Sequence, residues 1–175
     1  SFSVDFAIGA VDGSGVTTAV TDGTEQLNAT YGFQIDLNTS FTGEDSLDIS
    51  IDAGNGATTG PLAEFDLNGG SDALTVDGVS YQFPVGDSMT VLVGDNTDGS
   101  ALFTTACAYG GPSNTLDDCG NVNAGFTNGG AMAGASYDFG NGFTAAVGYA
   151  GPETGIMTDE SLDAYGANVA YTADN

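Results

Sequence analysis

Hydrophobic and polar residues alternate with a period of two along most of this 175-residue chain. In the segment SFSVDFAI, the hydrophobic residues Phe2, Val4, Phe6 and Ile8 are separated by small or acidic ones, and TYGFQIDLN and SLDISID repeat the pattern. A period of two places every second side chain on the same face of a β-strand, whereas an amphipathic helix needs a period near 3.6. Since no helical stripe of useful length interrupts the pattern, the sequence predicts an all-β fold.

The alternating runs are short and are separated by turn sequences such as TDGT, NGG, VDG and DNTDGS. The other runs are AEFDLN, ALTV, VSYQF, MTVLV, GASYDF, FTAAVGY and DAYGANVAY. Together they predict an antiparallel meander of about ten strands. The clearest hairpin is YDFGNGFTAAVGY, in which Gly-Asn-Gly joins two runs. We expect residues 1–175 to form a single antiparallel β domain.

Alternation alone does not say what each face of the sheet contacts. A soluble sandwich turns its hydrophobic face inward, whereas a membrane barrel turns it toward lipid and lines its lumen with the polar face. Tyrosines at strand ends favour a barrel, although ordinary β-propensity also explains them. Four acidic residues in mid-strand are our candidates for a lumen lining: Asp36, Asp48, Asp52 and Asp66. A solvated outer face of a soluble sheet explains them equally well. The predicted fold is therefore of the β-barrel type, either a partial barrel or a sheet completed by neighbouring chains.

Charge excludes several functions. The chain has 24 acidic residues and no Lys, Arg or His, which gives a formal net charge of −24. Contacts to nucleic-acid phosphates need cationic side chains, and Ser-His-Asp or Cys-His systems need a base that is missing here. Adjacent acids on a strand point to opposite faces and so do not form the carboxylate pair of a glycosidase. We expect a protein that is not an enzyme and does not bind nucleic acid.

Because the chain has no basic side chains, its carboxylates can interact only with solvent, backbone N–H groups, hydroxyls or cations. Mutual repulsion at this charge favours a saline or divalent-rich setting. No pattern requires a cofactor, but Ca²⁺ or another divalent cation is the one that carboxylate and carbonyl oxygens would hold. Turn chemistry or diffuse screening by cations also explains the three candidate clusters: Asp95, Asn96 and Asp98; Asp117, Asp118 and Asn121; and Asp12, Asp22 and Glu25.

The two cysteines, Cys107 and Cys119, lie at either end of the Gly- and Pro-containing segment AYGGPSNTLDD. A disulfide between them would contribute about 3 kcal/mol on the chain-entropy model. Such a bond forms in an oxidising compartment, and two free thiols are the alternative. We therefore expect the protein in an outer membrane or outside the cell.

Three segments carry a family resemblance: LNTSFTGEDSLDISIDAGNG, VSYQFPVGDSMTVLVGDN and ASYDFGNGFTAAVGYAG. Over residues 30–171 the chain resembles the outer-membrane porins of cyanobacteria, the carbohydrate-selective-porin-like barrels associated with a surface-layer-homology domain. Residues 37–43, 52–55 and 81–86 are the most specific. The resemblance implies the N-terminal part of the barrel region of a usually trimeric channel, which lies in outer-membrane lipid and admits ions and small solutes passively. It implies no enzymatic activity.

The chain departs from this family in lacking the surface-layer-homology domain, its linker and the aromatic C-terminal strand. About ten strands also fall short of the 16–18 strands of open porins. A sheet of this kind has two unpaired edges, so we expect a homo-oligomer that forms through them. Two other functions remain open: a subunit of an extracellular, divalent-stabilised β-rich filament or assembly, and a soluble acidic β-sandwich adhesin.

Overall fold

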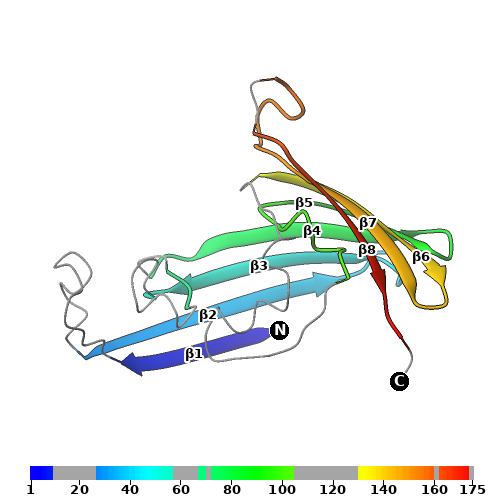
Figure 1. Cartoon of the computed structure of the whole chain (residues 1–175). Coiled ribbons are helices and arrows are strands. Elements are labelled where there is room, and N and C mark those ends of the chain that lie inside the picture. Colours follow the sequence, from blue (N-terminus) through cyan, green and yellow to red (C-terminus); the bar gives the residue numbers. More distant parts are fainter. Residues whose placement is uncertain (10–26, 57–66, 70–71, 105–129, 160–161, 174–175) are drawn as a thin grey trace, which may run out of the picture. The chain divides into compact units, whose positions relative to one another are not determined.

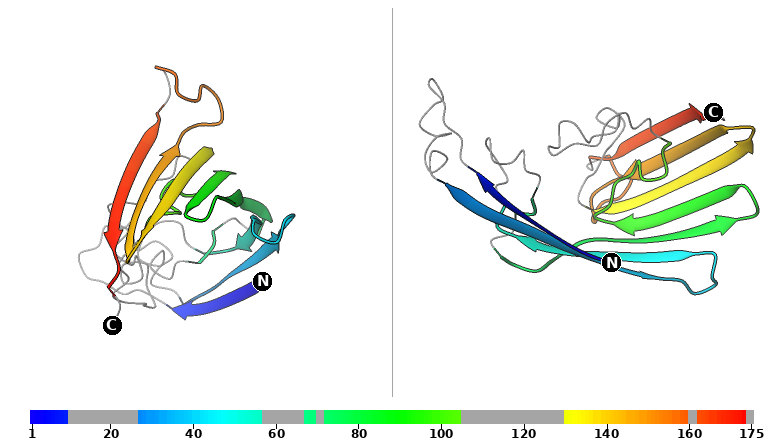
Figure 2. Two further views of the ribbon diagram at one scale, coloured as in Figure 1. Left: turned by 90° about the vertical axis from the view of Figure 1, so that its right-hand side faces the viewer. Right: turned by 90° about the horizontal axis from the view of Figure 1, so that it is seen from below.

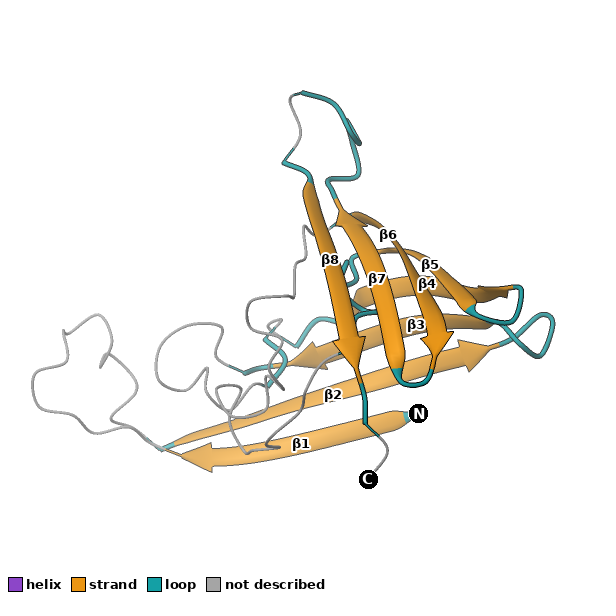
Figure 3. Cartoon of the chain, turned by 45° about the vertical axis from the view of Figure 1, so that its right-hand side comes forward, coloured by secondary structure: helices purple, strands orange, loops and turns teal. Residues whose placement is uncertain are grey.

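The computed structural model describes residues 1–9, 27–56, 67–69, 72–104, 130–159 and 162–173 (Figure 1). Within these ranges the secondary structure consists of strands and turns without a helix, as Figure 3 shows. The strands are β1 (Phe2–Gly9), β2 (Asn28–Thr39), β3 (Ser46–Gly54), β4 (Thr75–Val85), β5 (Met89–Asp95), β6 (Ala131–Gly140), β7 (Phe143–Ala150) and β8 (Ala164–Tyr171).

The eight strands form one antiparallel sheet in which each strand pairs with the next along the chain. This confirms the predicted all-β meander. The predicted number of strands was too high for the described residues, and the sheet is not closed into a barrel: β1 and β8 are its edges. Of the predicted strand AEFDLN, residues 63–66 lie outside the described residues, and residues 67–68 are not in a strand.

Of the predicted strand ALTV, Thr75 and Val76 belong to β4 together with VSYQF, whereas residues 73–74 are not in a strand. The sequence VDG, which was predicted as a turn, lies within β4. The hydrophobic alternation changes phase there, from Val76 at an even position to Val79 at an odd one. The register of β4 with β5 begins at Val79, after this change of phase. Gly78 is buried, and a Cβ atom at this position would lie 2.8 Å from the Thr97 side chain. Glycine at this position therefore allows two segments to approach closely, and it does not form a turn.

Contacts divide the chain into two compact units. The described part of the first comprises residues 1–9, 27–36, 50–56, 67–69 and 72–76. In it β1 pairs with β2 from Phe2↔Ile35 to Gly9↔Asn28. Asn55 extends the unit, since its backbone N–H donates to Tyr31 O at 3.1 Å and its side-chain oxygen accepts from Tyr31 N at 2.7 Å.

The second unit comprises residues 37–49, 77–104, 130–159 and 162–173 of the described chain. Its strands β4 to β8 lie side by side, as the right-hand view of Figure 2 shows. The buried hydrophobic residues of this unit include Leu92, Met132, Ala146 and Ala150. All four have even numbers, so they lie on one face of β5, β6 and β7, whereas Tyr149, which is also buried, lies on the other face.

The hairpin of β6 and β7 was predicted correctly. Both Asn141 (φ 53°) and Gly142 (φ 82°) have positive φ angles, as the central residues of a type I′ turn require. Asp138 fixes the approach to the turn, because its carboxylate accepts a hydrogen bond from the backbone N–H of Gly140 at 2.7 Å. The sequence Gly-Asn-Gly therefore determines where the two strands reverse.

Candidate functional site

The first unit has a hydrophobic face that other described residues do not cover. On β1 the residues of this face are exposed, and Phe6 reaches 78%. Phe33 and Ile35 of β2 are half-buried because they lie beside β1 in the same sheet. Aromatic rings contact across the two strands, with 6.0 Å between the centroids of Phe2 and Phe33 and 6.4 Å between those of Phe6 and Tyr31. The hydrophobic residues therefore form a continuous surface rather than the interior of a sandwich.

The second unit has a hydrophobic face of the same kind, formed by the odd-numbered residues of β4 to β8. Register aligns these residues, for example Val91↔Ala135, Ala135↔Val147 and Val147↔Ala167. Val169 is 78% exposed and Val147 is 57% exposed. The described residues place no second sheet against them, so this face requires a covering that the described chain does not supply.

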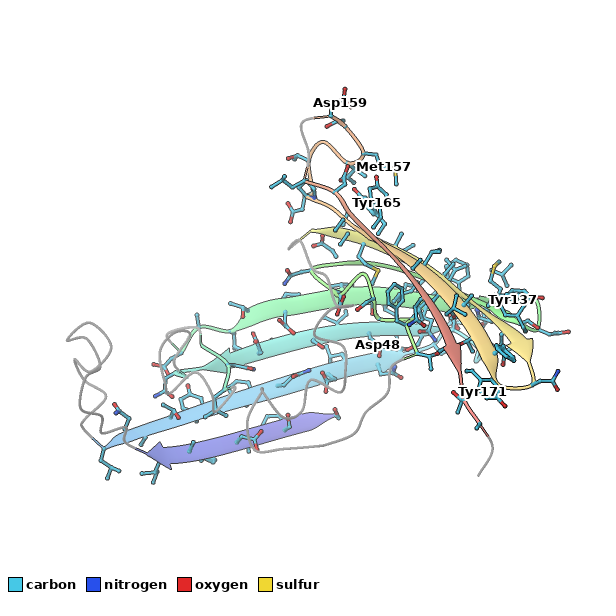
Figure 4. All side chains as sticks on the ribbon, in the orientation of Figure 1. Asp48, Tyr137, Met157, Asp159, Tyr165 and Tyr171 are labelled. Carbon is cyan, nitrogen blue, oxygen red and sulfur yellow. The ribbon has the colours of Figure 1, made fainter. Side chains whose placement is uncertain are left out.

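Aromatic side chains lie at both ends of this hydrophobic face. Near the β6–β7 turn, the centroids of Tyr137 and Phe139 are 4.9 Å apart and those of Phe143 and Tyr171 are 4.7 Å apart. At the other end the centroids of Tyr149 and Tyr165 are 5.3 Å apart; Tyr165 is exposed, whereas Tyr149 is buried and donates a hydrogen bond from its hydroxyl to Asp163 at 2.7 Å. Figure 4 shows Tyr165 and Tyr171 at opposite ends of β8. We call these two sets the aromatic rows; they are Tyr137, Phe139, Phe143 and Tyr171, and Tyr149 and Tyr165.

Small aliphatic residues fill the space between the aromatic rows, including Ala145, Val147, Ala167 and Val169. The two tyrosines of β8 are six positions apart, which corresponds to about 20 Å along the strand. An outer-membrane barrel has an apolar band roughly 25 Å tall between two aromatic girdles. Because barrel strands are tilted by about 35–45°, the distance along β8 corresponds to roughly 15 Å of height, so the band between the aromatic rows is about 10 Å narrower than that of such a barrel.

The opposite face of β2 and β3 carries acidic residues. Asp36 accepts hydrogen bonds from the side chains of Gln34 at 2.5 Å and Ser50 at 3.1 Å. Asp48 accepts a hydrogen bond from the side-chain amide of Asn38 at 2.5 Å. The bonds of Ser50 to Asp36 and of Asn38 to Asp48 join even-numbered residues of the two strands. Asp52 is also even-numbered on β3, which places it on the face of Asp48, and it accepts a hydrogen bond from the Thr75 hydroxyl at 2.5 Å.

In the second unit the even-numbered face of β5 to β8 carries mostly small residues and is partly covered by another segment of the chain. Thr104 N donates to the side-chain oxygen of Asn168 at 3.2 Å, and the Thr104 and Thr144 hydroxyls are 2.9 Å apart. Leu102 lies over Gly134, and Ser100 is only 2% exposed. Residues 98–104, which we call the covering segment, therefore pack on this face. Sequence reasoning missed this contact, although the small residues of the face were a signal for it.

Asp45 is a buried carboxylate that the sequence analysis did not identify. It accepts hydrogen bonds from the hydroxyls of Ser40, Thr42 and Tyr81, each at 2.6 Å, and from the backbone N–H of Thr42 at 2.7 Å and of Phe41 at 3.0 Å. The hydroxyl donors, that of Ser40 first, hold the pKa of the carboxyl well below its usual value of 3.8. Asp45 is therefore an ionised anchor for the β2–β3 turn.

Beside Asp45 lies an open groove of about 380 Å³. Its lining combines the turn with β4 and consists of Thr42, Glu44, Asp45, Tyr81, Phe83 and Pro84. Both carboxylate oxygens of Asp45 already accept hydrogen bonds from the protein, and the Tyr81 hydroxyl is bonded to one of them. The polar groups of the groove thus hold the turn instead of pointing toward a ligand.

The predicted cation clusters are only partly within the described chain. Asp98 accepts hydrogen bonds at 2.8 Å from both the N–H and the hydroxyl of Ser100, and the Asn96 side chain bonds Asp77 O. Asp95 ends β5 and is not brought into a group with two other acids or cysteines; the described residues contain no such group. The remaining predicted residues lie outside the described chain: Asp12, Asp22, Glu25, Asp66, Cys107, Asp117, Asp118, Cys119 and Asn121.

No helix in the described part of the chain is long and apolar enough to cross a membrane. No family model matches the sequence, and comparisons with curated proteins and with solved structures found no significant match. The site therefore consists of two chemically different faces of one open sheet, and the chemistry of these faces must carry any functional argument.

Proposed function

We propose that this chain forms part of the wall of a passive diffusion channel for ions and small solutes in an outer membrane. The observation that carries the proposal is the exposed hydrophobic face of β4 to β8 with aromatic residues at both ends, such as Tyr165 and Tyr171. Lipid is the surrounding that suits this face, because transmembrane barrels place aliphatic residues at the membrane centre and aromatic ones at its borders.

The channel prefers cations. The polar face carries Asp36, Asp48 and Asp52, and the chain has no Lys, Arg or His to offset them. Rings of acidic side chains attract cations and repel anions when they line a pore. The channel needs no cofactor or catalytic group, since the passage of solutes is diffusive. The resemblance to cyanobacterial outer-membrane porins supports the same function.

Planar-bilayer recording of the purified full-length protein tests the proposal. We expect stepwise conductance and, in a KCl gradient, a reversal potential that shows selectivity for K⁺. In the variant with Asp36→Asn, Asp48→Asn and Asp52→Asn, the permeability ratio of K⁺ to Cl⁻ falls by roughly twofold or more, because the polar face loses its negative charge.

The matched control removes the same charge away from the polar face, with Glu44→Gln, Asp87→Asn and Glu153→Gln. These three residues lie in exposed loops and turns. The control keeps the selectivity of the unmodified channel. Absence of conductance, or a preference for anions in the unmodified protein, overturns the proposal.

The two open edges of the sheet support a second candidate function, an extracellular filament or assembly stabilised by divalent cations. Electron microscopy of the protein in buffer with Ca²⁺ and with a chelator tests it. Filaments that disperse with chelator support this function. Uniform small particles under both conditions exclude it.

A further inference from the structure

The groove beside Asp45 combines two chemical features that the channel function does not use. Its volume of about 380 Å³ lies in the range of small-molecule sites. The turn between β2 and β3 supplies one wall through Thr42, Glu44 and Asp45, and β4 supplies the other through Tyr81 and Phe83. The groove therefore has one acidic wall and one aromatic wall.

The aromatic wall is held in a fixed position by its neighbours. The rings of Tyr81 and Phe83 are stacked, with 5.5 Å between their centroids. Phe41 of the turn contacts Tyr81 edge-on, with 6.0 Å between the centroids, and the Tyr81 hydroxyl donates to Asp45 at 2.6 Å. The rings are thus in place before a ligand arrives, which lowers the entropic cost of binding.

Asp45 supplies negative charge to the groove but no hydrogen-bond acceptor. An ionised carboxylate has about four acceptor sites. Five donors already occupy those of Asp45: the hydroxyls of Ser40, Thr42 and Tyr81 and the backbone N–H groups of Phe41 and Thr42. These donors are neutral, so they satisfy the lone pairs and leave the charge of the carboxylate in place.

This arrangement does not suit the usual ligands of acidic sites. Ca²⁺ takes about six to eight oxygen ligands, and a primary ammonium group needs acceptors for its three N–H donors. Asp45 has no acceptor site left for either of them. A neutral apolar ligand would contact the rings but would gain nothing from the charge.

A quaternary ammonium group matches both walls of the groove. It carries a positive charge and has no N–H group to donate. Its methyl groups pack on the faces of aromatic rings in a cation–π interaction, in which the cation lies within about 6 Å of a ring centroid. The spacing of Tyr81 and Phe83 allows one cation to lie within that distance of both rings.

The charge of the chain determines which compounds with this group are suitable. Glu44 lines the groove, is exposed and adds a second negative charge. The chain has no Lys, Arg or His to bind an anionic substituent. A zwitterion would bring its carboxylate or phosphate close to Glu44 and Asp45, and like charges repel. The ligand should therefore be a net cation.

We propose that the groove between the β2–β3 turn and β4 is a binding site for a small quaternary ammonium cation of the choline type. Tyr81 and Phe83 contact its methyl groups, while Glu44 and Asp45 supply the charge that attracts it. Both rings belong to the odd-numbered, hydrophobic face of β4, opposite to the polar face that we assign to the lumen. The site goes beyond the proposed channel function and does not depend on it.

Ligand-observed NMR of the full-length protein in a non-ionic detergent tests the site, with choline as the probe. We expect saturable binding of choline. Its neutral isostere 3,3-dimethyl-1-butanol, in which carbon replaces the nitrogen, should bind about fivefold or more weakly, because it has the same shape without the charge. Absence of saturable choline binding overturns the proposal. Equal binding of the two compounds overturns it as well, because the groove would then recognise only an apolar shape.

Three further probes identify the recognised chemistry. Ethanolamine carries a primary ammonium group, glycine betaine adds a carboxylate to the quaternary ammonium group, and phosphocholine adds the phosphate of a lipid head group. Each should bind about fivefold or more weakly than choline. If ethanolamine binds as well as choline, the groove attracts any cation and the proposal is wrong. If phosphocholine binds as well, the ligand is a zwitterionic head group and the proposed net cation is wrong.

Two variants test the walls of the groove separately. Glu44→Gln removes one of the two charges and should raise the Kd of choline by about twofold or more. Phe83→Leu removes a ring and should raise it by about fivefold or more. Circular dichroism verifies that each variant is folded. Because Glu44 is exposed, Glu44→Gln tests the site even if Phe83→Leu does not fold.

The matched controls are Glu153→Gln in the exposed β7–β8 loop and Phe139→Leu in an aromatic row, neither of which lines the groove. Both should bind choline as the unmodified protein does. If each control weakens binding as much as its partner variant, choline follows the diffuse charge and exposed rings of the chain, and the site is refuted. Choline binding without conductance overturns only the channel function, whereas conductance without choline binding overturns only this site.

Discussion

Asp45 holds the turn between β2 and β3 in place. Its carboxylate accepts hydrogen bonds from side chains of the turn and from Tyr81 on β4. In Asp45→Asn, one acceptor oxygen becomes a donor NH₂ group that faces other donors, so we expect a lower urea midpoint of unfolding. Circular dichroism measures this midpoint. The control Glu44→Gln removes the same charge at an exposed neighbour and leaves the midpoint nearly unchanged; equal effects of the two variants would contradict the prediction.

The pKa of Asp45 predicts how its effect depends on pH. Its pKa in the folded protein is lowered from the usual 3.8 because hydroxyls of Ser40, Thr42 and Tyr81 donate hydrogen bonds to the ionised carboxylate. The ionised carboxylate therefore contributes its full stability above pH 3.8. This contribution is lost as the pH falls from 3.8 toward the lower pKa of the folded protein. The difference in urea midpoint between the unmodified protein and Asp45→Asn should stay constant down to about pH 5 and shrink below it. If the difference in urea midpoint stayed constant throughout the acid titration, the pH dependence would not come from the carboxyl of Asp45.

For single residues, the sequence shows which side chains are acidic but does not predict which of them become buried and hold a turn in place. Ser40 and Thr42 are close to Asp45 in the chain, and turn chemistry makes such local bonds predictable in principle. The Tyr81 hydroxyl comes from 36 residues away. Only the pairing of the strands brings this donor to the turn, so the burial of Asp45 could not be inferred from local spacing.

The covering segment is hydrogen-bonded to the sheet at Thr104. Asn168 binds Thr104 through two hydrogen bonds, one from Thr104 N at 3.2 Å and one to Thr104 O at 3.3 Å. Asn168→Ala removes both, each worth about 1 kcal/mol. We expect amide exchange in residues 98–104 to rise by about fivefold or more, as measured by hydrogen–deuterium exchange.

A matched control for this prediction is Ser136→Ala, which removes a hydroxyl from the same face of β6 without a change at Thr104. Exchange in the covering segment should remain at the level of the unmodified protein. If Asn168→Ala also leaves exchange unchanged, the segment is held by its hydrophobic contacts, such as that of Leu102, and not by the amide of Asn168.

The strands were predictable because the period of two fixes them, and the Gly-Asn-Gly hairpin was predictable because its turn chemistry is specific. The number of strands was not predictable in this way. Val76 and Val79 belong to different phases of the alternation, so the sequence around them is similar to that of two strands separated by a turn. The covering segment has no period at all. Its place on the sheet follows from Gly134 and Asn168, which are distant in sequence.

For the whole molecule, alternation predicted two chemically different faces but not the surroundings of each. Phe33 and Ile35 would alternate in the same way in a sandwich core. The difference lies in which face is covered: the small-residue face of β5 to β8 receives the covering segment, while Val147 and Val169 remain exposed. Such a long-range contact is absent from any local pattern.

A lysine scan of adjacent positions on β6 measures which face contacts lipid. Ala135 lies on the hydrophobic face opposite Val91 and Val147, and Ser136 lies on the other face opposite Thr90 and Ala146. Ala135→Lys places a charge in the lipid between the aromatic rows, which costs about 2–4 kcal/mol at mid-membrane depth. Urea-dependent folding into lipid vesicles should weaken by that amount, whereas Ser136→Lys, at the same depth, should fold almost as well as the unmodified protein. If both variants fold equally well, or Ser136→Lys is the weaker, the hydrophobic face does not contact lipid and the channel assignment fails with it.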